Sequence, residues 1–269
     1  MKKAIILVSF GVIDEQIRHT CIDSITLKIK KYFPDYTVCT AFTSMFILKK
    51  LRKQNIHIDS LPEVLTKLQQ EQYEEVVIQP THLTPGEEYE NKIIAVSEVY
   101  KTVFPKLKVG SPVFSVEDEI PDKDDYRIGL QCILQQIVSL AKTEEVVLMG
   151  HGSPHQHNPI YEILQRKADE LNLPITIGVL EPTDYPGLED VIARLKNKNK
   201  KNIYLMPLLL AGGMHVMQDM AGESPDSWLN KLKRAGFIVR VYEKGLGENE
   251  AFQNIYIQHI QEALKTNSK

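Results

Sequence analysis

The sequence predicts an α/β fold in which two similar Rossmann-like domains, each with a parallel sheet, lie around a central cleft. Three observations lead to this prediction. Short apolar runs alternate with segments whose apolar residues recur every three or four positions, as strands and helices do in α/β proteins. The polar stretch Ser115–Asp125 divides the apolar runs four and four. Short signatures then recur at matching places in the two halves.

The apolar runs are expected to be buried strands of parallel sheets. In chain order they are Ala4–Phe10, Tyr36–Phe42, Glu75–Gln79, Leu107–Val113, Glu145–Met149, Ile175–Leu180, Ile203–Leu210 and Ile238–Tyr242. The segments with helical periodicity lie between them. They are Ile17–Tyr32, Pro62–Gln70, Glu87–Phe104, Ile160–Leu171, Leu188–Leu195 and Trp228–Arg234.

The polar stretch in the middle of the chain is expected to be the linker between the domains. We therefore expect an N-terminal α/β domain over residues 1–120 and a C-terminal α/β domain over residues 121–269. A last helix is expected over 248–266, where Ile255, Ile257, Ile260 and Leu264 are available for packing. This helix either closes the second domain or crosses back onto the first.

Composition excludes several classes of protein. The net charge is −3 with no large asymmetry along the chain, which argues against nucleic acid as the main partner. Cys21, Cys39 and Cys132 match no disulfide framework or Cys-x-x-Cys motif, so a reducing, cytoplasmic setting is expected. The run Ala4–Phe10 has no cleavage site after it, and no stretch approaches the ~18–20 apolar residues of a membrane span. Whether the protein forms a homo-oligomer stays open.

The most informative local sequence is Gly150-His151-Gly152, which directly follows the apolar run Glu145–Met149. Ligands of open α/β sheets bind outside the carboxyl ends of the strands, so chemistry is expected at His151. The flanking glycines allow a tight turn and leave the imidazole uncrowded. The alternative is a histidine that caps the strand and bonds a neighbouring carbonyl group.

The third strand of each half runs into a proline, Pro80 or Pro207. A glycine follows each proline at the sixth position, and Glu88 or His215 follows at the eighth. Chance could produce this pairing, because proline and glycine are common after strands. It nevertheless suggests duplicated halves that face each other across a cleft.

Histidines and carboxylates gather after the expected strands, where they suit a divalent transition metal such as Co²⁺, Ni²⁺, Fe²⁺ or Zn²⁺. The candidates are His82, Glu87, Glu88, His151, Glu181 and His215. For His82, which lies between two prolines, loop packing is the favoured interpretation, and for His155 and His157 it is a solvated loop. His19, His57 and His259 fall in helical or linker segments and are expected at the surface.

Nucleotide and serine-hydrolase signatures are missing from the sequence. There is no G-x-x-x-x-G-K-[ST] loop and no G-x-G-x-x-G after the first strand, so no nucleotide cofactor is expected. A G-x-S-x-G elbow is also missing, which argues against a serine hydrolase.

Short motifs along nearly the whole chain together resemble one family, the anaerobic sirohydrochlorin cobaltochelatases. The motifs are Val8-Ser9-Phe10-Gly11, Ala41-Phe42-Thr43-Ser44, Gly86-Glu87-Glu88-Tyr89-Glu90, Met149-Gly150-His151-Gly152, Leu205-Met206-Pro207-Leu208 with His215, Asp226-Ser227-Trp228 and Gly245-Leu246-Gly247-Glu248. The family belongs to the class II chelatases, which resemble protoporphyrin ferrochelatase in fold and need no nucleotide.

This resemblance implies a lyase-class metal chelatase, which inserts Co²⁺ into the tetrapyrrole sirohydrochlorin during anaerobic cobalamin biosynthesis. It places the two metal-binding histidines on His151 and His215, and the cleft carboxylates on Glu88 and Glu181. His151, His215 and Glu88 would also be the catalytic residues, with neutral histidine holding the ion or accepting a pyrrole proton. One departure is Val12-Ile13, where the family usually has small hydroxyl residues.

Several alternatives remain open. Iron or nickel insertion into the same tetrapyrrole is the nearest, because ligand type barely separates these ions. A non-catalytic protein that binds metal or tetrapyrrole is another, and a non-haem iron enzyme is a third. At the level of single residues, Glu88 could be a solvated carboxylate at a helix N-terminus, and Glu181 could pair with a basic residue near its strand.

Overall fold

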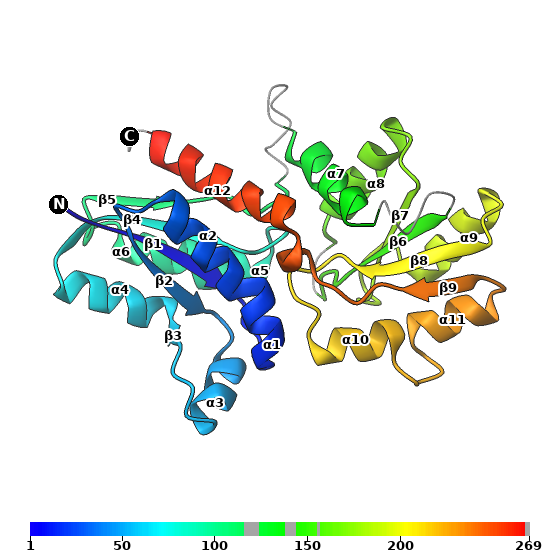
Figure 1. Cartoon of the computed structure of the whole chain (residues 1–269), viewed down its shortest axis with the longest axis horizontal. Coiled ribbons are helices and arrows are strands. Elements are labelled where there is room, and N and C mark those ends of the chain that lie inside the picture. Colours follow the sequence, from blue (N-terminus) through cyan, green and yellow to red (C-terminus); the bar gives the residue numbers. More distant parts are fainter. Residues whose placement is uncertain (116–123, 138–143, 155–156, 267–269) are drawn as a thin grey trace. The chain divides into compact units, whose positions relative to one another are not determined.

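The computed structural model describes residues 1–115, 124–137, 144–154 and 157–266. It consists of two compact units (Figure 1). Unit 1 comprises Met1–Ser115 together with Glu250–Lys269, and unit 2 comprises Val116–Asn249. Most of the expected linker Ser115–Asp125 lies outside the described residues.

Unit 1 contains a five-stranded sheet with the order β3-β2-β1-β4-β5, and every strand pair is parallel. Its strands are β1 (Lys2–Ser9), β2 (Thr37–Phe42), β3 (Asp59–Ser60), β4 (Tyr73–Pro80) and β5 (Lys106–Val109). Residues Ala4 to Val8 of β1 are fully buried, because helices cover both faces of the sheet. All the strands therefore end at one edge, where ligand-binding loops of such sheets lie.

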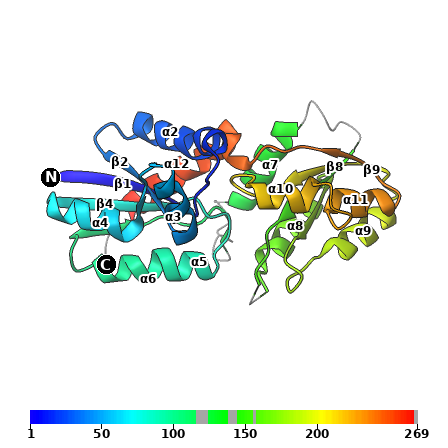
Figure 2. The same cartoon turned by 90° about the horizontal axis from the view of Figure 1, so that it is seen from below.

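The helices of unit 1 cover the two faces of this sheet (Figure 2). They are α1 (Glu15–Arg18), α2 (Ser24–Tyr32), α3 (Met45–Lys53), α4 (Leu61–Gln70), α5 (Glu87–Tyr89), α6 (Ala95–Tyr100) and α12 (Glu250–Lys265), with π-helical turns at His19–Asp23 and Glu90–Ile94. Ala4, Ile6 and Val8 pack against α4 and the segment around Ile93. Successive strand residues point to opposite faces, so Ile5 and Leu7 point to the other side.

Unit 2 contains a four-stranded parallel sheet with the order β7-β6-β8-β9. Its strands are β6 (Glu145–Gly150), β7 (Ile175–Val179), β8 (Asn202–Pro207) and β9 (Ile238–Val241). This order repeats β2-β1-β4-β5 of unit 1, with β6 in the place of β1 and β8 in the place of β4. The two units therefore share one topology, as the recurring signatures of the sequence suggested.

Five α-helices of unit 2 lie within the described residues, and the last three of them pack around Trp228, which is 4% exposed. They are α7 (Asp125–Ile137), α8 (Ile160–Glu170), α9 (Leu188–Asn197), α10 (Met214–Ala221) and α11 (Trp228–Arg234). The indole closely approaches the sheet at Gly178, where a Cβ atom would lie 2.8 Å from Trp228 Cη2 and 2.5 Å from Val191 Cγ2. Glycine at this position therefore lets the helices pack onto β7.

The last helix, α12, groups with unit 1 although it follows unit 2 in the sequence. The Tyr256 hydroxyl donates a hydrogen bond to Thr81 O at 3.1 Å, and Lys108 Nζ donates one to Leu264 O at 2.7 Å. His259 was expected at the surface, and this prediction is wrong. It is 1% exposed, and its Nδ1 lies 3.1 Å from Ser111 O, which gives the buried imidazole a hydrogen-bond partner.

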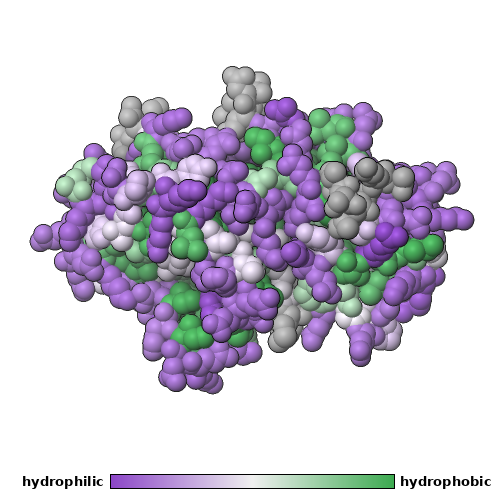
Figure 3. All heavy atoms as spheres, viewed as in Figure 1, coloured by the Kyte–Doolittle hydropathy of each residue, from purple (hydrophilic) through white to green (hydrophobic). Residues whose placement is uncertain are grey.

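The predicted fold class is confirmed, and each of the eight predicted strands is present. The two-residue strand β3 and the helices α3, α7 and α10 were not predicted. Among the described residues, no helix combines the length and apolar character that crossing a bilayer requires. Figure 3 shows a largely hydrophilic surface on the face it presents, with hydrophobic atoms in small groups.

Candidate metal centre

His151 lies at the carboxyl end of β6, and its side chain is exposed. Beyond the strands, the backbone ladder between β6 and β7 continues for two more bonds. Leu180 N donates to Gly150 O at 2.9 Å, and Glu181 N donates to His151 O at 2.9 Å. The structure thus places two predicted site residues, His151 and Glu181, directly beside each other in the backbone of unit 2.

The two residues that flank His151 must be glycines, because neighbouring side chains leave no room for a Cβ atom at either position. A Cβ atom on Gly150 would lie 2.4 Å from Cε1 of Tyr161, whose hydroxyl accepts a hydrogen bond from Gly152 N at 3.2 Å. Gly152 has a φ of 83°, and a Cβ atom there would lie 2.9 Å from Glu181 Cβ. Only glycine adopts this left-handed conformation without strain, so the turn fixes the direction of the His151 backbone.

The imidazole of His151 has one contact with its own loop. Its Nδ1 lies 3.3 Å from Gly152 O, which is the neighbouring carbonyl group of the alternative interpretation. Nε2 has no hydrogen-bond partner among the residues the structure describes. If Nδ1 carries the proton, Nε2 keeps its lone pair for a metal ion or a proton. A structural contact and a metal-binding role are therefore compatible here.

Glu181 is half-buried at the turn that follows β7. Its side chain forms no ion pair with any described residue, so the alternative of a salt bridge near the strand end has no support among them. A carboxylate without a cationic partner remains available as a ligand or a base.

Glu88 and His215 occupy equivalent positions in the two units. Glu88 is the second residue of α5, which begins after β4 and its last residue, Pro80. His215 is the second residue of α10, which begins after β8 and its last residue, Pro207. The matching offsets in the sequence therefore correspond to matching positions on helices that follow equivalent strands.

Buried polar atoms without partners lie near the start of α5. Glu88 Oε1 is buried, and so are both ring nitrogens of His82; none of these three atoms has a hydrogen-bond partner among the described residues. Burial lowers the pKa of His82 to about 4, so its imidazole is neutral at physiological pH. Its ring centroid lies 6.3 Å from that of Tyr89. This carboxylate oxygen, unlike one at a fully solvated helix N-terminus, has neither a hydrogen-bond donor nor exposed surface.

The loop after β6 carries His157, one of the two histidines for which a solvated loop was expected. His155 lies outside the described residues, whereas His157 is bonded to protein carboxylates at both ring nitrogens. The side chain of His157 is 31% exposed, so this residue is both partly solvated and bonded to the protein. One of these carboxylates belongs to Asp184, whose side chain is fully buried. The sequence offered no signal for Asp184, because the pair joins residues far apart along the chain.

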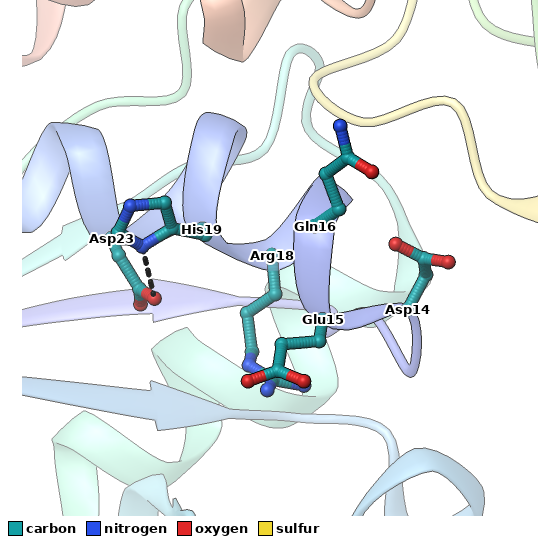
Figure 4. A pocket seen from close by; sticks show the side chains of 6 residues that line it. All are labelled: Asp14, Glu15, Gln16, Arg18, His19 and Asp23. Atoms are coloured by element: carbon teal, nitrogen blue, oxygen red, sulfur yellow. Dashed lines mark ion pairs between the residues drawn. The ribbon is translucent and has the colours of Figure 1, made fainter.

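A hollow in unit 1 involves none of the predicted site residues. Figure 4 shows the side chains that line it, from Asp14, Glu15, Gln16, Arg18, His19 and Asp23. His19 Nδ1 lies 3.6 Å from Asp23 Oδ2, and the Arg18 guanidinium donates to Ile13 O at 3.3 Å. These short-range contacts within one segment do not form a metal site.

Within the described part of the chain, no group of three or more His, Cys, Asp or Glu side chains is placed to hold a metal ion. The four-residue assignment, with Glu88 in unit 1 and the others in unit 2, stays a prediction.

Comparison with known proteins gives consistent results for sequence and fold. Residues 3–265 match the cobalt chelatase (CbiK) family. The sirohydrochlorin cobaltochelatase of Salmonella typhimurium is 34% identical over 98% of this chain and 97% of its own. The sirohydrochlorin cobaltochelatase CbiKC of Nitratidesulfovibrio vulgaris is 29% identical over 98% of this chain and 91% of its own.

Among solved structures, SirB from Bacillus subtilis with Fe³⁺ has a similar fold. Its TM-score is 0.67 at 16% identity, and the similarity covers 98% of this chain and 96% of SirB. CbiX, described as the terminal enzyme of sirohaem biosynthesis in denitrifying bacteria, has a TM-score of 0.58 at 17% identity, with 98% of this chain and 100% of CbiX covered. The resemblance noted in the sequence is confirmed: the chain belongs to the cobalt chelatase (CbiK) family.

Proposed function

We propose that this protein is a sirohydrochlorin cobaltochelatase, which inserts Co²⁺ into sirohydrochlorin without a nucleotide during anaerobic cobalamin biosynthesis. The full-length family match supports the reaction class. The observation that carries the proposal is the exposed imidazole of His151 beside Glu181 at the ends of two neighbouring strands. Cys21, Cys39 and Cys132 form no disulfide within the described chain, which fits the reducing, cytoplasmic setting that is part of the same proposal.

Insertion requires that the metal ion lose bound water and that two pyrrole N–H groups lose their protons. We assign to His151 and His215 the task of presenting the ion, since a neutral imidazole binds such ions well and releases them to a stronger ligand. A site with few protein ligands suits a transferred ion, because a closed four-ligand site would retain it.

We assign proton uptake to the carboxylates. Glu88 Oε1 is buried and has no hydrogen-bond donor among the described residues. A carboxylate oxygen without donors keeps its lone pairs available for an incoming proton or metal ion. Glu181 would serve as a further ligand or base, since its side chain has no ion-pair partner in the described chain.

Substrate binding requires cations, because sirohydrochlorin is a flat macrocycle that carries many carboxylates. The exposed face of α3 combines apolar side chains, which suit a flat macrocycle, with lysines, which suit its carboxylates. Met45 and Phe46 are 58% and 62% exposed, and Lys50 Nζ lies 4.5 Å from the centroid of the Phe46 ring. The helix begins beside Phe10, which follows β1 and whose carbonyl accepts a hydrogen bond from Ser44 N at 3.2 Å.

The lysines of this face are available for a ligand. Arg52 is paired with Glu63 at 2.8 Å, but no described carboxylate pairs with Lys49, Lys50 or Lys53. Phe46, Lys49, Lys50 and Lys53 recur at helical spacing, so their side chains share one side of α3. We propose that this α3 face holds the macrocycle edge and its carboxylates.

The proposal is tested by mixing purified protein with sirohydrochlorin and Co²⁺ anaerobically and following the absorption spectrum, with Fe²⁺ and Ni²⁺ in parallel. We expect acceleration over the uncatalysed rate, and the preferred metal decides between cobalt, iron and nickel insertion. His151→Ala should lower kcat about 100-fold or more, as loss of a proton-transfer or metal-presenting group does. His57→Ala, at an exposed histidine of unit 1, is the matched control.

Each outcome has a distinct meaning. Absence of acceleration with all three metals would refute the chelatase and leave a binding protein. A His151→Ala variant with the full rate would refute the site assignment alone.

A further inference from the structure

One buried carboxylate, that of Asp184, connects the segment after β6 to the turn after β7. Asp184 Oδ2 accepts a hydrogen bond from Ser153 N at 2.9 Å. Its Oδ1 accepts from Asn158 N at 3.2 Å and from Tyr185 N at 2.9 Å, and lies 2.7 Å from His157 Nδ1. Ser153, His157 and Asn158 follow β6, whereas Asp184 and Tyr185 follow β7. This carboxylate therefore joins the segment that carries His151 to the turn that carries Glu181.

His157 connects the same turn to a helix. Its Nε2 lies 2.9 Å from Glu162 Oε2 on α8, and the Tyr185 hydroxyl donates to the same oxygen at 3.1 Å. The rings of His157 and Tyr185 stack at 4.0 Å between centroids and 8° between planes. Both ring nitrogens face carboxylates, which accept but do not donate, so the arrangement requires a protonated imidazolium. These contacts leave His157 no lone pair for a metal ion.

The geometry points to His157 as a positioning residue: with both ring nitrogens bonded to carboxylates, it holds the His151 segment against the Glu181 turn and α8. The two backbone bonds beyond β6 and β7 end at His151 and Glu181. Gly152 N then donates to the Tyr161 hydroxyl, and the bond from Ser153 N to Asp184 is the first after it that ties the segment to the turn after β7. The position of the metal-presenting imidazole therefore depends on a charged pair that is not itself a ligand. This inference rests on the proposed metal site.

The charge of His157 gives this role a pH dependence. Burial alone would lower its pKa, but the hydrogen bonds that it donates to Asp184 and Glu162, together with the negative charges of these carboxylates, raise the pKa above the ordinary value. Among the described residues, the titratable groups that face the ring are these two carboxylates and Tyr185, whose ring stacks on it. The interaction is complete below the ordinary pKa of about 6.5 and is lost as the pH rises through the raised value. Deprotonation of the imidazolium removes one of its two N–H donors, and it also removes the positive charge between the carboxylates of Asp184 and Glu162.

The test uses His157→Ala and His157→Lys in the full chain. We measure the dissociation constant for Co²⁺ without tetrapyrrole, by metal titration from mildly acidic to mildly alkaline pH. His157→Ala should weaken Co²⁺ binding about tenfold, the usual lower range for a residue that orients metal ligands. His157→Lys should restore most of the affinity, because it keeps a positive charge with several donors. It should also extend that affinity to higher pH than in the wild type, because an ordinary lysine titrates near 10.4.

A second measurement separates this role from the proposed reaction. Hydrogen exchange at the Ser153 amide in metal-free protein should be faster in His157→Ala than in the wild type or His157→Lys. His19→Ala, which removes an exposed histidine near Asp23 in unit 1, should leave both measurements unchanged.

Unchanged Co²⁺ affinity and unchanged Ser153 exchange in His157→Ala would overturn the inference, even if the variant is less stable. A wild-type protein that binds Co²⁺ but inserts none into sirohydrochlorin would refute the proposed function and leave the His157 result interpretable.

Discussion

Gly152→Ala should destabilise unit 2 by more than its backbone conformation alone explains. The residue has a φ of 83°, and an added Cβ atom would lie 2.9 Å from Glu181 Cβ and 3.0 Å from Val179 Cβ. Gly236, also in unit 2, has a φ of 97° and no heavy atom within 4 Å of its added Cβ. The two substitutions therefore share backbone strain, but only the first adds crowding.

The expected losses in the free energy of unfolding follow from backbone strain and from crowding of the added Cβ atom. Left-handed backbone in a non-glycine residue costs roughly 1–2 kcal/mol, which is the expected loss in the free energy of unfolding for Gly236→Ala. Overpacking against β-carbons, which cannot rotate away, adds about 1–3 kcal/mol. Gly152→Ala should therefore lose about 2–5 kcal/mol.

The assay is urea unfolding followed by tryptophan fluorescence. Trp228 is the chain's single tryptophan and is buried in unit 2, so its signal reports the unit that contains both glycines. Comparing the two variants in one transition avoids assuming that the whole chain unfolds in a single step. Equal losses in the two variants would refute the crowding argument and mean that the His151 turn relaxes freely.

Two further predictions concern unit 1. Burial lowers the pKa of His82 from 6.5 to about 4, so the unfolded chain binds the proton first as the pH falls. Acidification through this window should cost up to about 3 kcal/mol, and His82→Phe should flatten that part of the stability–pH curve; an unchanged slope would contradict this. Reversing the charge of Lys49 and Lys50 together should raise the KM for sirohydrochlorin about fivefold or more, without changing Co²⁺ affinity. Lys101→Glu, at an exposed lysine of unit 1, is the control, and an equal KM change there would mean that the α3 face is not specific.

The strands were predictable because both faces of each sheet are covered, which makes a strand such as Val146–Met149 continuously apolar. Helix α3 was harder to predict, because its buried side is narrow and consists of Ile47, Leu48 and Leu51. The sequence also gave no sign of β3, which has two residues. Pattern reasoning therefore works where burial is extensive and fails where an element is short or largely exposed.

The candidate site could be predicted only in part. The position of His151 followed from a buried strand and the two glycines, and these are local features. The contact between His157 and Asp184 joins residues 27 positions apart, and neither lies in a recognisable motif. Tyr161 likewise reaches Gly150 and Gly152 from the next helix. Such side-chain pairs arise from the tertiary fold, so the sequence gives candidate residues but not their partners.

The grouping of α12 with unit 1 has a consequence for biosynthesis. The ribosome makes the strands of unit 1 first, but the helix that buries one of their surfaces comes last. Unit 2 has all its strands and helices once residue 249 has emerged, whereas unit 1 still awaits α12. Unit 2 can therefore mature during translation, while unit 1 keeps an apolar sheet surface uncovered until α12 has emerged from the ribosome.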